Sequence, residues 1–125
     1  MRALGEELVA GLGPGAIVLL EGSLGAGKTT LVRGMLEGLG HLGPVRSPTF
    51  NLLQAFSTTP PLLHADLYRL KSWQGIGIED YLSTHICCIE WPDRAAGLVR
   101  PNSAWNVSIQ FSGAGRDVVV TPPSE

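Results

Sequence analysis

The sequence predicts an α/β fold, a three-layer sandwich around a mostly parallel sheet with antiparallel strands at its C-terminal end. Three observations predict it. An unbroken apolar run precedes a glycine-rich loop and then apolar residues at helical spacing, which is a strand–loop–helix unit. Two further apolar runs each end in a carboxylate, and the C-terminal part alternates apolar and polar residues around a glycine turn. The length of 125 residues fits a single domain, residues 1–125.

The N-terminal third supplies two helices and one strand. Three leucines spaced by four predict a short amphipathic helix over residues 2–11. The continuous apolar run predicts a strand over 16–21 that is buried on both faces. After a glycine loop over 22–29, we expect a helix that reaches about Leu39. The spaced residues are Leu4, Leu8 and Leu12 in the first helix, and Leu31, Val32, Met35, Leu36 and Leu39 in the second.

The remaining elements are shorter and are separated by proline- and glycine-rich breakers. In chain order we expect a loop over 40–48, an edge strand over 49–56, a turn over 57–61, a strand over 62–66, a helical turn over 78–82, and strands over 86–90, 105–111 and 117–121. Trp105, Val107, Ile109 and Phe111 alternate with other residues, so they are expected to share one half-buried face. Residues 121–125 are expected to form a frayed tail.

The glycine loop carries the most specific motif of the chain. Residues Gly22 to Thr29 match the phosphate-binding pattern G-x-x-x-x-G-K-[ST] at every fixed position. Glycines allow a tight turn whose N–H groups form an anion cradle, and the following helix directs its positive end at the phosphates. Lys28 is expected to reach the β- and γ-phosphates, and Thr29 to offer its hydroxyl to Mg²⁺. A plain glycine-rich turn with an exposed lysine is the alternative, which the flanking strand and helix disfavour. The expected nucleotide-binding residues of this segment are Gly22, Ser23, Leu24, Gly25, Ala26, Gly27, Lys28, Thr29 and Thr30.

Two carboxylates and a threonine are candidates for the Mg²⁺ and water chemistry that a bound triphosphate needs. Asp66 and Glu90 each end an apolar strand, and parallel strands bring such ends to one edge of the sheet. Either could hold Mg²⁺ while the other orients the attacking water. Thr49 follows Ser47-Pro48 in a loop, where its hydroxyl could complete the Mg²⁺ shell. The alternatives are solvated strand ends or helix caps for the acids and a plain loop hydroxyl for Thr49.

Charge and cysteine content exclude several classes. A net charge of -2 with scattered basic residues indicates no general DNA or RNA surface, so any contact with RNA is expected through a partner or local contacts. Adjacent Cys87 and Cys88 in an apolar run rarely suit a disulfide, which favours reduced thiols and a cytoplasmic location. No apolar run approaches the length of a membrane span, and the N-terminal residues lack a signal-peptide core.

A few other side chains have open interpretations. His64 stands two residues before Asp66, so both are expected on one side of a strand, with a backbone group as the favoured partner of the histidine. Tyr68 and Arg69 could reach phosphates or a partner, although a surface ion pair is commoner for such an arginine. Trp73 could be an exposed anchor for a partner or part of the core.

Several segments in order carry a resemblance to one family. They are Gly22 to Arg33 (GSLGAGKTTLVR), Ser47 to Phe50 (SPTF), His64 to Leu70 (HADLYRL), Gly77 to Tyr81 (GIEDY) and Ile89 to Pro92 (IEWP). Together they resemble the TsaE (YjeE) family, bacterial ATPases of tRNA threonylcarbamoyladenosine biosynthesis. The phosphate loop alone is shared by many families, whereas the combination is specific. The resemblance runs from about Leu4 to Arg94.

The resemblance implies a P-loop NTPase-like fold and a defined activity. Family members bind ATP and Mg²⁺, hydrolyse ATP weakly alone, and act with TsaB and TsaD, which make the modified adenosine of tRNAs that read ANN codons. The threonylcarbamoyl group is not transferred by TsaE itself, and tRNA is met only through the complex. By position it implies Lys28 and Thr29 as phosphate and Mg²⁺ groups, Thr49 as the switch residue, Asp66 in the Walker B role, Glu90 as a second acidic residue at the metal, and Trp91 as a group that helps hold the nucleotide or partner. Lys28, Asp66 and Glu90 are therefore the expected catalytic residues.

The sequence departs from the family in two places. The family carries a strand before its first helix, whereas Met1 falls almost at that helix. Either the start is displaced or the adenine side of the pocket is built differently. The segment Lys71 to Ile76 is a few residues shorter than in the family, which could alter a partner surface.

Two other functions compete with a partner-dependent ATPase. A small-molecule or nucleotide kinase shares the phosphate loop, although the chain has little room for a substrate lid. A GTPase switch is the third class, but no Asn-Lys-x-Asp segment is present in the sequence. No arginine finger is evident either, which fits slow hydrolysis by the isolated chain.

Overall fold

A six-stranded sheet in the order β2-β3-β4-β1-β5-β6 organises the chain. The structure is a computed structural model that describes residues 1–23, 27–45 and 52–124. Its strands are β1 (Ile17–Gly22), β2 (Leu53–Phe56), β3 (Leu62–Asp66), β4 (Ile86–Glu90), β5 (Trp105–Ser112) and β6 (Gly115–Thr121), and its helices are α1 (Arg2–Val9) and α2 (Lys28–Gly38). Strands β3, β4, β1 and β5 are parallel, whereas β2 and β6 pair antiparallel at the two edges. The predicted fold class is confirmed, and β2 adds a second antiparallel edge to the predicted C-terminal one.

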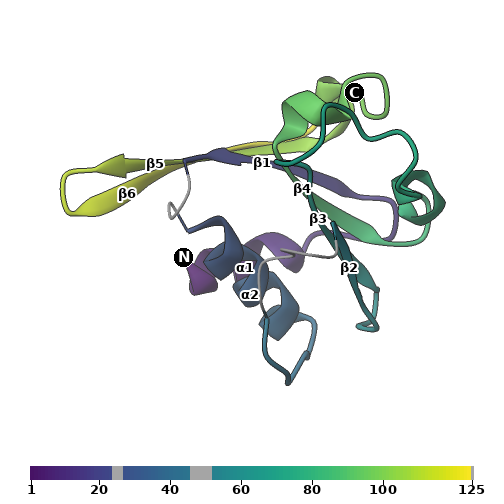
Figure 1. The fold of residues 1–125 in the computed structure, drawn as a ribbon. Coiled ribbons are helices and arrows are strands. Elements are labelled where there is room, and N and C mark those ends of the chain that lie inside the picture. Colours follow the sequence, from purple (N-terminus) through teal and green to yellow (C-terminus); the bar gives the residue numbers. More distant parts are fainter. Residues whose placement is uncertain (24–26, 46–51, 125) are drawn as a thin grey trace.

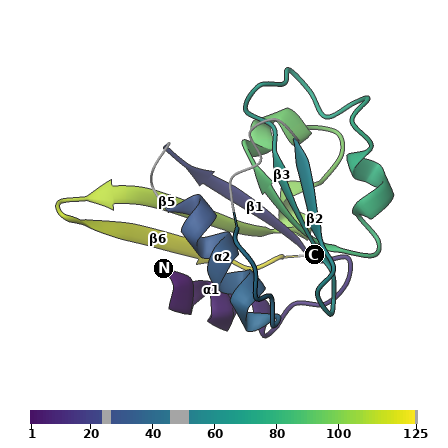
Figure 2. The same ribbon diagram turned by 60° about the horizontal axis from the view of Figure 1, so that its bottom comes forward.

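The two faces of the sheet are covered differently. Figure 1 shows α1 and α2 together on one face, and the turned view in Figure 2 shows them side by side. Successive residues of a strand point to opposite faces, so Val18 and Leu20 pack toward the helices while Leu19 packs on the other side. That other side is covered by loops and three 3₁₀ turns, η1 (Ile78–Tyr81), η2 (Pro92–Ala95) and η3 (Pro101–Ser103). The third layer of the sandwich is therefore built without an α-helix among the described residues.

Glycines allow α1 and α2 to touch backbone to backbone. A Cβ atom added at Gly34 would lie 2.1 Å from the carbonyl oxygen of Arg2, and one added at Gly5 would lie 2.3 Å from that of Leu31. Real side chains cannot occupy such distances, so only glycine permits this approach. An exposed bidentate ion pair at 2.8 Å between Arg2 and Glu37 also joins the two helices. These contacts hold α1 along the length of α2.

Most predicted boundaries are confirmed within two residues. The first helix ends at Val9 rather than residue 11, since the glycines that follow Ala10 do not continue it. The edge strand is confirmed over Leu53–Phe56, and the start of its predicted range lies outside the described residues. Both cysteines are buried and form no disulfide, as predicted. Burial raises the pKa of the Cys87 thiol to about 12.

Two predictions for the C-terminal part were wrong. Phe111 is 53% exposed, unlike Val107 and Ile109, because the β5–β6 hairpin extends past the helices, as Figure 1 shows. Its ring lies 4.5 Å from the Arg116 guanidinium instead of in the core. The tail is not frayed from residue 121: Thr121 still belongs to β6, and the backbone N–H of Ser124 donates to the Asn102 carbonyl at 2.9 Å.

Candidate functional site

The end of β1 and the start of α2 form the centre of the site. Gly27 is the N-cap of α2 with φ of 110°, a left-handed conformation that favours glycine, and it offers no side-chain cap to the helix. Because glycine has no side chain, Gly27 itself cannot cap the first N–H groups of α2, which point out of the N-terminal end of the helix. With the helix dipole they form a binding site for anions such as phosphate. The predicted phosphate-binding segment thus has the required strand and helix on either side.

Lys28 lies inside the protein rather than on its surface. It is only 5% exposed, and its Nζ donates to the carbonyl oxygen of Gly22 at 2.9 Å. The same nitrogen lies 3.5 Å from Oε1 of Glu90 and 5.0 Å from the centre of the Trp91 ring. A carbonyl, a carboxylate and an aromatic ring therefore hold the ammonium group between the end of β1 and the end of β4, and the exposed-lysine alternative is excluded.

Glu90 is held from its other side by His64. Nε2 of His64 lies 2.6 Å from Oε2 of Glu90, and the two side chains are 0% and 5% exposed. Burial by itself raises the pKa of Glu90, but the hydrogen bond and charge of His64 and the charge of Lys28 together hold that pKa below its ordinary value. The predicted backbone partner of His64 is therefore wrong, because β3 and β4 pair in a register that sets the ring against a carboxylate. The second ring nitrogen, Nδ1, is buried without a hydrogen-bond partner among the described residues.

Asp66 lies beside Glu90 but has a different environment. The two residues are register partners on β3 and β4, so both side chains leave the sheet on the face that carries α2. His64 shares that face, as predicted. Asp66 is half-buried, and its Oδ1 accepts a hydrogen bond at 3.1 Å from the backbone N–H of Tyr68. Of the two acids, Glu90 is the one that contacts Lys28.

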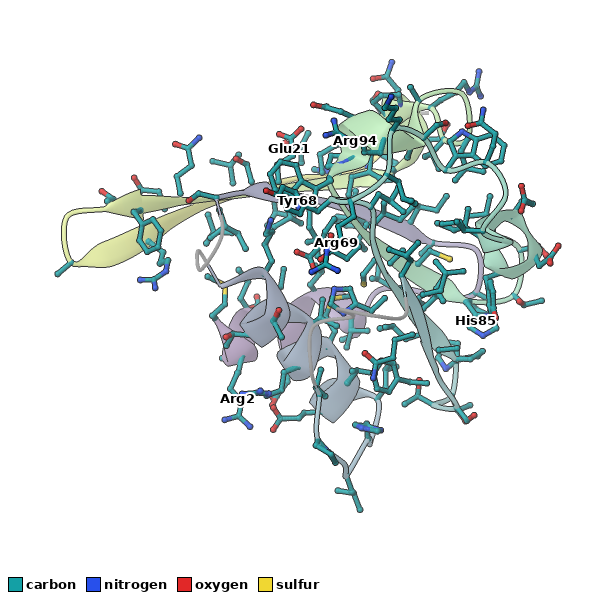
Figure 3. All side chains as sticks on the ribbon, in the orientation of Figure 1. Arg2, Glu21, Tyr68, Arg69, His85 and Arg94 are labelled. Carbon is teal, nitrogen blue, oxygen red and sulfur yellow. The ribbon has the colours of Figure 1, made fainter. Side chains whose placement is uncertain are left out.

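Trp91 closes the site on the side of β4. It has φ of 61°, the one positive value among the described residues other than glycine, which is an uncommon conformation for a bulky side chain. This turn directs its ring between Lys28 and Tyr68, whose ring centre is 4.7 Å away. A cavity of about 180 Å³ lies here and is lined by Leu20, Glu21, Gly22, Lys28, Trp91, Pro92 and Asp93. Figure 3 shows Glu21 on the side of β1 away from α1 and α2.

A larger cavity lies on the opposite side of the start of α2. Its volume is about 460 Å³, and it is lined by Met1, Leu4, Gly27, Thr30, Arg116 and Val118. These residues come from α1, the start of α2 and β6. Except for Gly27 and Thr30, the sequence interpretation gave none of them a functional role.

The chain matches the family model described as threonylcarbamoyl adenosine biosynthesis protein TsaE over residues 1–118. The chain belongs to the TsaE family. This confirms the resemblance that the sequence motifs carried. At the level of the family it also confirms the link with tRNA threonylcarbamoyladenosine biosynthesis.

Individual relatives agree. The protein of Haemophilus influenzae is 42% identical over 107 residues, 82% of this chain and 67% of the relative. The protein of Nostoc sp. is 39% identical over an alignment of 132 residues, 95% of this chain and 75% of the relative, and that of Bacillus subtilis is 38% identical over 93 residues, 72% and 59%. All three carry the name tRNA threonylcarbamoyladenosine biosynthesis protein TsaE. The chain thus spans between 59% and 75% of the length of these relatives.

A solved structure shares the fold. The crystal structure of Bacillus subtilis YdiB superposes with a TM-score of 0.83 and 29% identity, covering 98% of this chain and 78% of that one. In the part of this family member that the structure describes, no helix is long and apolar enough to cross a bilayer.

The structure brings some predicted site residues together and leaves others undescribed. Lys28, Glu90 and Trp91 meet at the smaller cavity, with Asp66 next to Glu90. Gly22 and Ser23 lie at the end of β1, and Thr29 and Thr30 lie in the first turn of α2. Leu24, Gly25, Ala26 and Thr49 lie outside the described residues, so their roles stay predictions.

Three side chains of the segment HADLYRL, those of His64, Tyr68 and Arg69, differ in exposure. Tyr68 is exposed at the edge of the Trp91 ring, and Arg69 is exposed on the side of the sheet that carries α2 (Figure 3). His64 is buried and makes the contact with Glu90 that the sequence interpretation missed. A signal existed, since a histidine inside an apolar strand must find a polar partner. Trp73 packs against the core and donates to the Ala96 carbonyl at 3.0 Å, which supports the core alternative.

The donors present fit Mg²⁺. This ion takes hard oxygen ligands and is usually held by one or two carboxylates together with phosphate oxygens and water. Thr29 supplies a hydroxyl on α2, and Glu90 and Asp66 supply carboxylates from the adjacent strand ends. Over residues 1–23, 27–45 and 52–124 no group of three acidic, histidine or cysteine side chains forms a ready-made metal cluster.

Proposed function

We propose that the chain binds Mg²⁺ and ATP at the start of α2, hydrolyses ATP slowly when alone, and supports threonylcarbamoyladenosine modification of tRNA together with TsaB and TsaD. The observation that carries the proposal is the buried Lys28 at the N-terminus of α2, 3.5 Å from the carboxylate of Glu90. A lysine at this position serves phosphate binding in P-loop proteins, and an adjacent acid serves metal or water positioning. Family membership supports the tRNA pathway.

Each described group has a task in this proposal. The N–H groups of α2 and the Lys28 ammonium stabilise charge on the β- and γ-phosphate oxygens. Glu90 or Asp66 orients the water that attacks the γ-phosphate in line. Mg²⁺, held by Thr29 and these carboxylates, would neutralise negative charge on the phosphates. When a triphosphate enters, Lys28 exchanges its contact with the Gly22 carbonyl for phosphate oxygens.

We expect slow ATP hydrolysis by the isolated chain because no arginine among the described residues lines the cavity beside Lys28. Among the described residues, two acids and one lysine are the charged side chains that line it. Arg94, close in sequence to Asp93, donates instead to the Leu70 carbonyl at 2.7 Å. Stabilising the charge of the leaving group is worth on the order of 10³–10⁵ in rate where an arginine finger does it. A partner protein that adds or aligns such a group would accelerate hydrolysis.

The net charge of the chain and its family together support a protein complex as the route by which the chain meets tRNA. A net charge of -2 indicates no general RNA-binding surface, so tRNA is met through the TsaB–TsaD complex. DNA and membranes have no part in the proposal.

The test is ATP hydrolysis with Mg²⁺ by the purified chain, alone and with TsaB, TsaD and tRNA. We expect low activity alone and a clear rise with the complex. Lys28→Ala should abolish both nucleotide binding and tRNA modification, whereas Lys71→Ala, at an exposed lysine, should change neither. Modification that persists in Lys28→Ala would contradict the proposal, and so would rapid hydrolysis by the chain alone that is unchanged by the complex.

A further inference from the structure

Two loops leave the sheet next to the acids of the candidate site. Asp66 ends β3 and is followed by a turn at residues 67–70, and Glu90 ends β4 and is followed by η2. The backbone N–H of Leu67 donates to the Glu90 carbonyl at 3.3 Å. Among the described residues, this is the last backbone hydrogen bond between the two segments. Beyond it, side-chain contacts must keep the two loops together.

Arg94 makes such a contact. Its Nε donates to the Leu70 carbonyl at 2.7 Å, a bond between residues 24 apart in the chain. Its backbone N–H donates to the Trp91 carbonyl at 3.0 Å, so the residue belongs to η2 and also reaches the turn that follows Asp66. A hydrogen bond from a charged donor is shorter and stronger than one between neutral groups. Figure 3 shows Arg94 on the side of the sheet away from α1 and α2.

No ion pair accounts for Arg94 in the part of the chain that the structure describes. Its side chain is partly buried, and the acid that precedes it, Asp93, is exposed. The described partner of the guanidinium is therefore the backbone of another loop. Such a bond fixes the distance between two loops and contributes little to the balance of surface charge.

The position of these loops determines the place of Trp91. A φ of 61° is uncommon for a bulky side chain, and such a conformation persists only where the surroundings fix it. The Trp91 ring packs on Tyr68, which belongs to the turn after β3, and lies 5.0 Å from Nζ of Lys28. A shift of η2 away from this turn would therefore move Trp91 and, through the peptide bond that joins them, Glu90.

A second side-chain bond joins the same two segments farther along both of them. Nε1 of Trp73 donates to the Ala96 carbonyl at 3.0 Å. Trp73 comes after Leu70 in the chain, and Ala96 comes after Arg94, so this bond is farther from the acids along both segments. It also runs from a side-chain N–H to a backbone carbonyl, which makes it a matched comparison for the bond of Arg94.

We propose that Arg94 is a positioning residue of the ATPase site. Its bond to Leu70 holds η2 against the turn that follows β3, and this keeps Glu90 and Trp91 in place at the site. The inference rests on the proposed function, because it requires that the Glu90 side of the site acts in ATP hydrolysis. Arg94 follows the last of the short segments that carry the family resemblance, Ile89 to Pro92.

The experiment removes the guanidinium and keeps the aliphatic stem. Arg94→Met should lower kcat for ATP hydrolysis, measured with TsaB, TsaD and tRNA, by about tenfold or more, because small displacements of positioning groups are costly in rate. The ATP affinity measured by calorimetry should stay within about threefold, since Lys28 and the helix N-terminus are unchanged. Arg94→Lys keeps a cationic donor and should have a kcat at least about threefold above that of Arg94→Met.

Two control variants separate positioning from general effects. Lys71→Ala removes one positive charge from an exposed position and should leave kcat unchanged. Trp73→Phe removes the outer hydrogen bond, keeps an aromatic ring, and should lower kcat by less than about twofold. Hydrogen exchange of residues 90–95 should be faster in Arg94→Met than in Trp73→Phe, and this measurement needs no nucleotide.

Thermal unfolding of each variant checks its folding, and Arg94→Gln is measured in place of Arg94→Met if the latter does not fold. A kcat within about twofold of the unaltered chain in a folded variant would overturn the inference. So would equal rates in Arg94→Met and Arg94→Lys, or a loss of ATP affinity as large as the loss of rate. If the unaltered chain neither binds nor hydrolyses ATP, the proposed function fails, and the exchange of residues 90–95 still decides whether Arg94 holds η2 in place.

Discussion

The two sides of β1 differ in the kinds of side chain that lie along them. On the β4 side, Lys28, Glu90 and His64 are charged or polar groups that are almost completely buried and in contact with one another. On the β5 side, the described lining of the larger cavity has three apolar side chains, those of Met1, Leu4 and Val118, together with Gly27, Thr30 and Arg116, and it includes no carboxylate. One strand and one helix N-terminus therefore border both a buried charged cluster and a cavity with apolar and polar walls. Interactions between charges are stronger in a buried site than at the surface.

The β4 and β5 sides of β1 also differ in how their residues are held in place. On the β4 side, Glu90 is held by two neighbours, since its carboxylate contacts both His64 and Lys28. The β5 side instead depends on how α1 and the hairpin are placed around α2. Within the β4 side, substitution of Glu90 should change the rate of hydrolysis more than nucleotide affinity, whereas substitution of Lys28 should abolish nucleotide binding.

Loss of the Glu90 carboxylate should have the largest effect. We expect Glu90→Gln to lower the rate of ATP hydrolysis by about 10²–10³-fold, because a group that positions metal or water contributes on this scale. ATP affinity should change by only a few fold, since Lys28 and the helix N-terminus remain. Steady-state hydrolysis and calorimetry measure the two. Glu79→Gln, at an exposed acid, is the control, and a normal rate in Glu90→Gln would leave Asp66 as the acting carboxylate.

Removal of the His64 ring should have the second largest effect. His64→Leu leaves the buried Glu90 carboxylate with one neighbour less, which should lower the free energy of unfolding by about 3 kcal/mol. His64→Gln keeps a donor near Oε2 and should recover part of both stability and hydrolysis rate. Urea denaturation and kinetics on the two variants test this. If His64→Leu and His64→Gln had equal stabilities and equal hydrolysis rates, packing and not the hydrogen bond would account for the contribution of His64.

A side chain that pushes α1 away from α2 should have a smaller effect, on the stability of the chain. In an open helix, Gly→Ala stabilises by about 1 kcal/mol, but at Gly34 the new Cβ would meet the Arg2 carbonyl oxygen at 2.1 Å. We expect Gly34→Ala to lower the free energy of unfolding by about 1–3 kcal/mol, which urea denaturation measures. Gly11→Ala, where a Cβ meets nothing within 4 Å, is the control. A stabilised Gly34→Ala variant would show that α1 moves without consequence.

The pH dependence of stability should be the smallest effect. The pKa of Glu90 in the folded chain is below its ordinary value of 4.5, so the unfolded chain binds a proton first as the pH falls. The stabilisation from this group is fully present above about 4.5 and is lost as the pH falls through the lower folded pKa. Thermal unfolding in EDTA from neutral to acidic pH should therefore fall less steeply in Glu90→Gln than in Glu79→Gln. Parallel curves for the two variants would contradict the prediction.

Much of this architecture could be predicted because it is encoded locally. The strand–loop–helix unit follows from hydrophobic periodicity and a motif whose fixed residues are contiguous, so Gly22, Lys28 and Thr29 could be identified without knowledge of the fold. The carboxylates at the ends of 62–66 and 86–90 were also visible as strand ends. Phe111 was misplaced because alternation reports which face a side chain takes and not how far the covering helices extend.

The sequence by itself determined the fold class, the phosphate motif and the family of this protein, since each depends on residues that are close together in the chain. Only the tertiary structure decided which acid contacts Lys28 and which group holds that acid. His64 and Glu90 are 26 residues apart, and the register of β3 and β4 brings their side chains to 2.6 Å. The cavity lined by residues of α1, α2 and β6 likewise depends on tertiary packing, since it joins residues from distant parts of the chain. Long-range pairing is set by global packing, which no local pattern encodes.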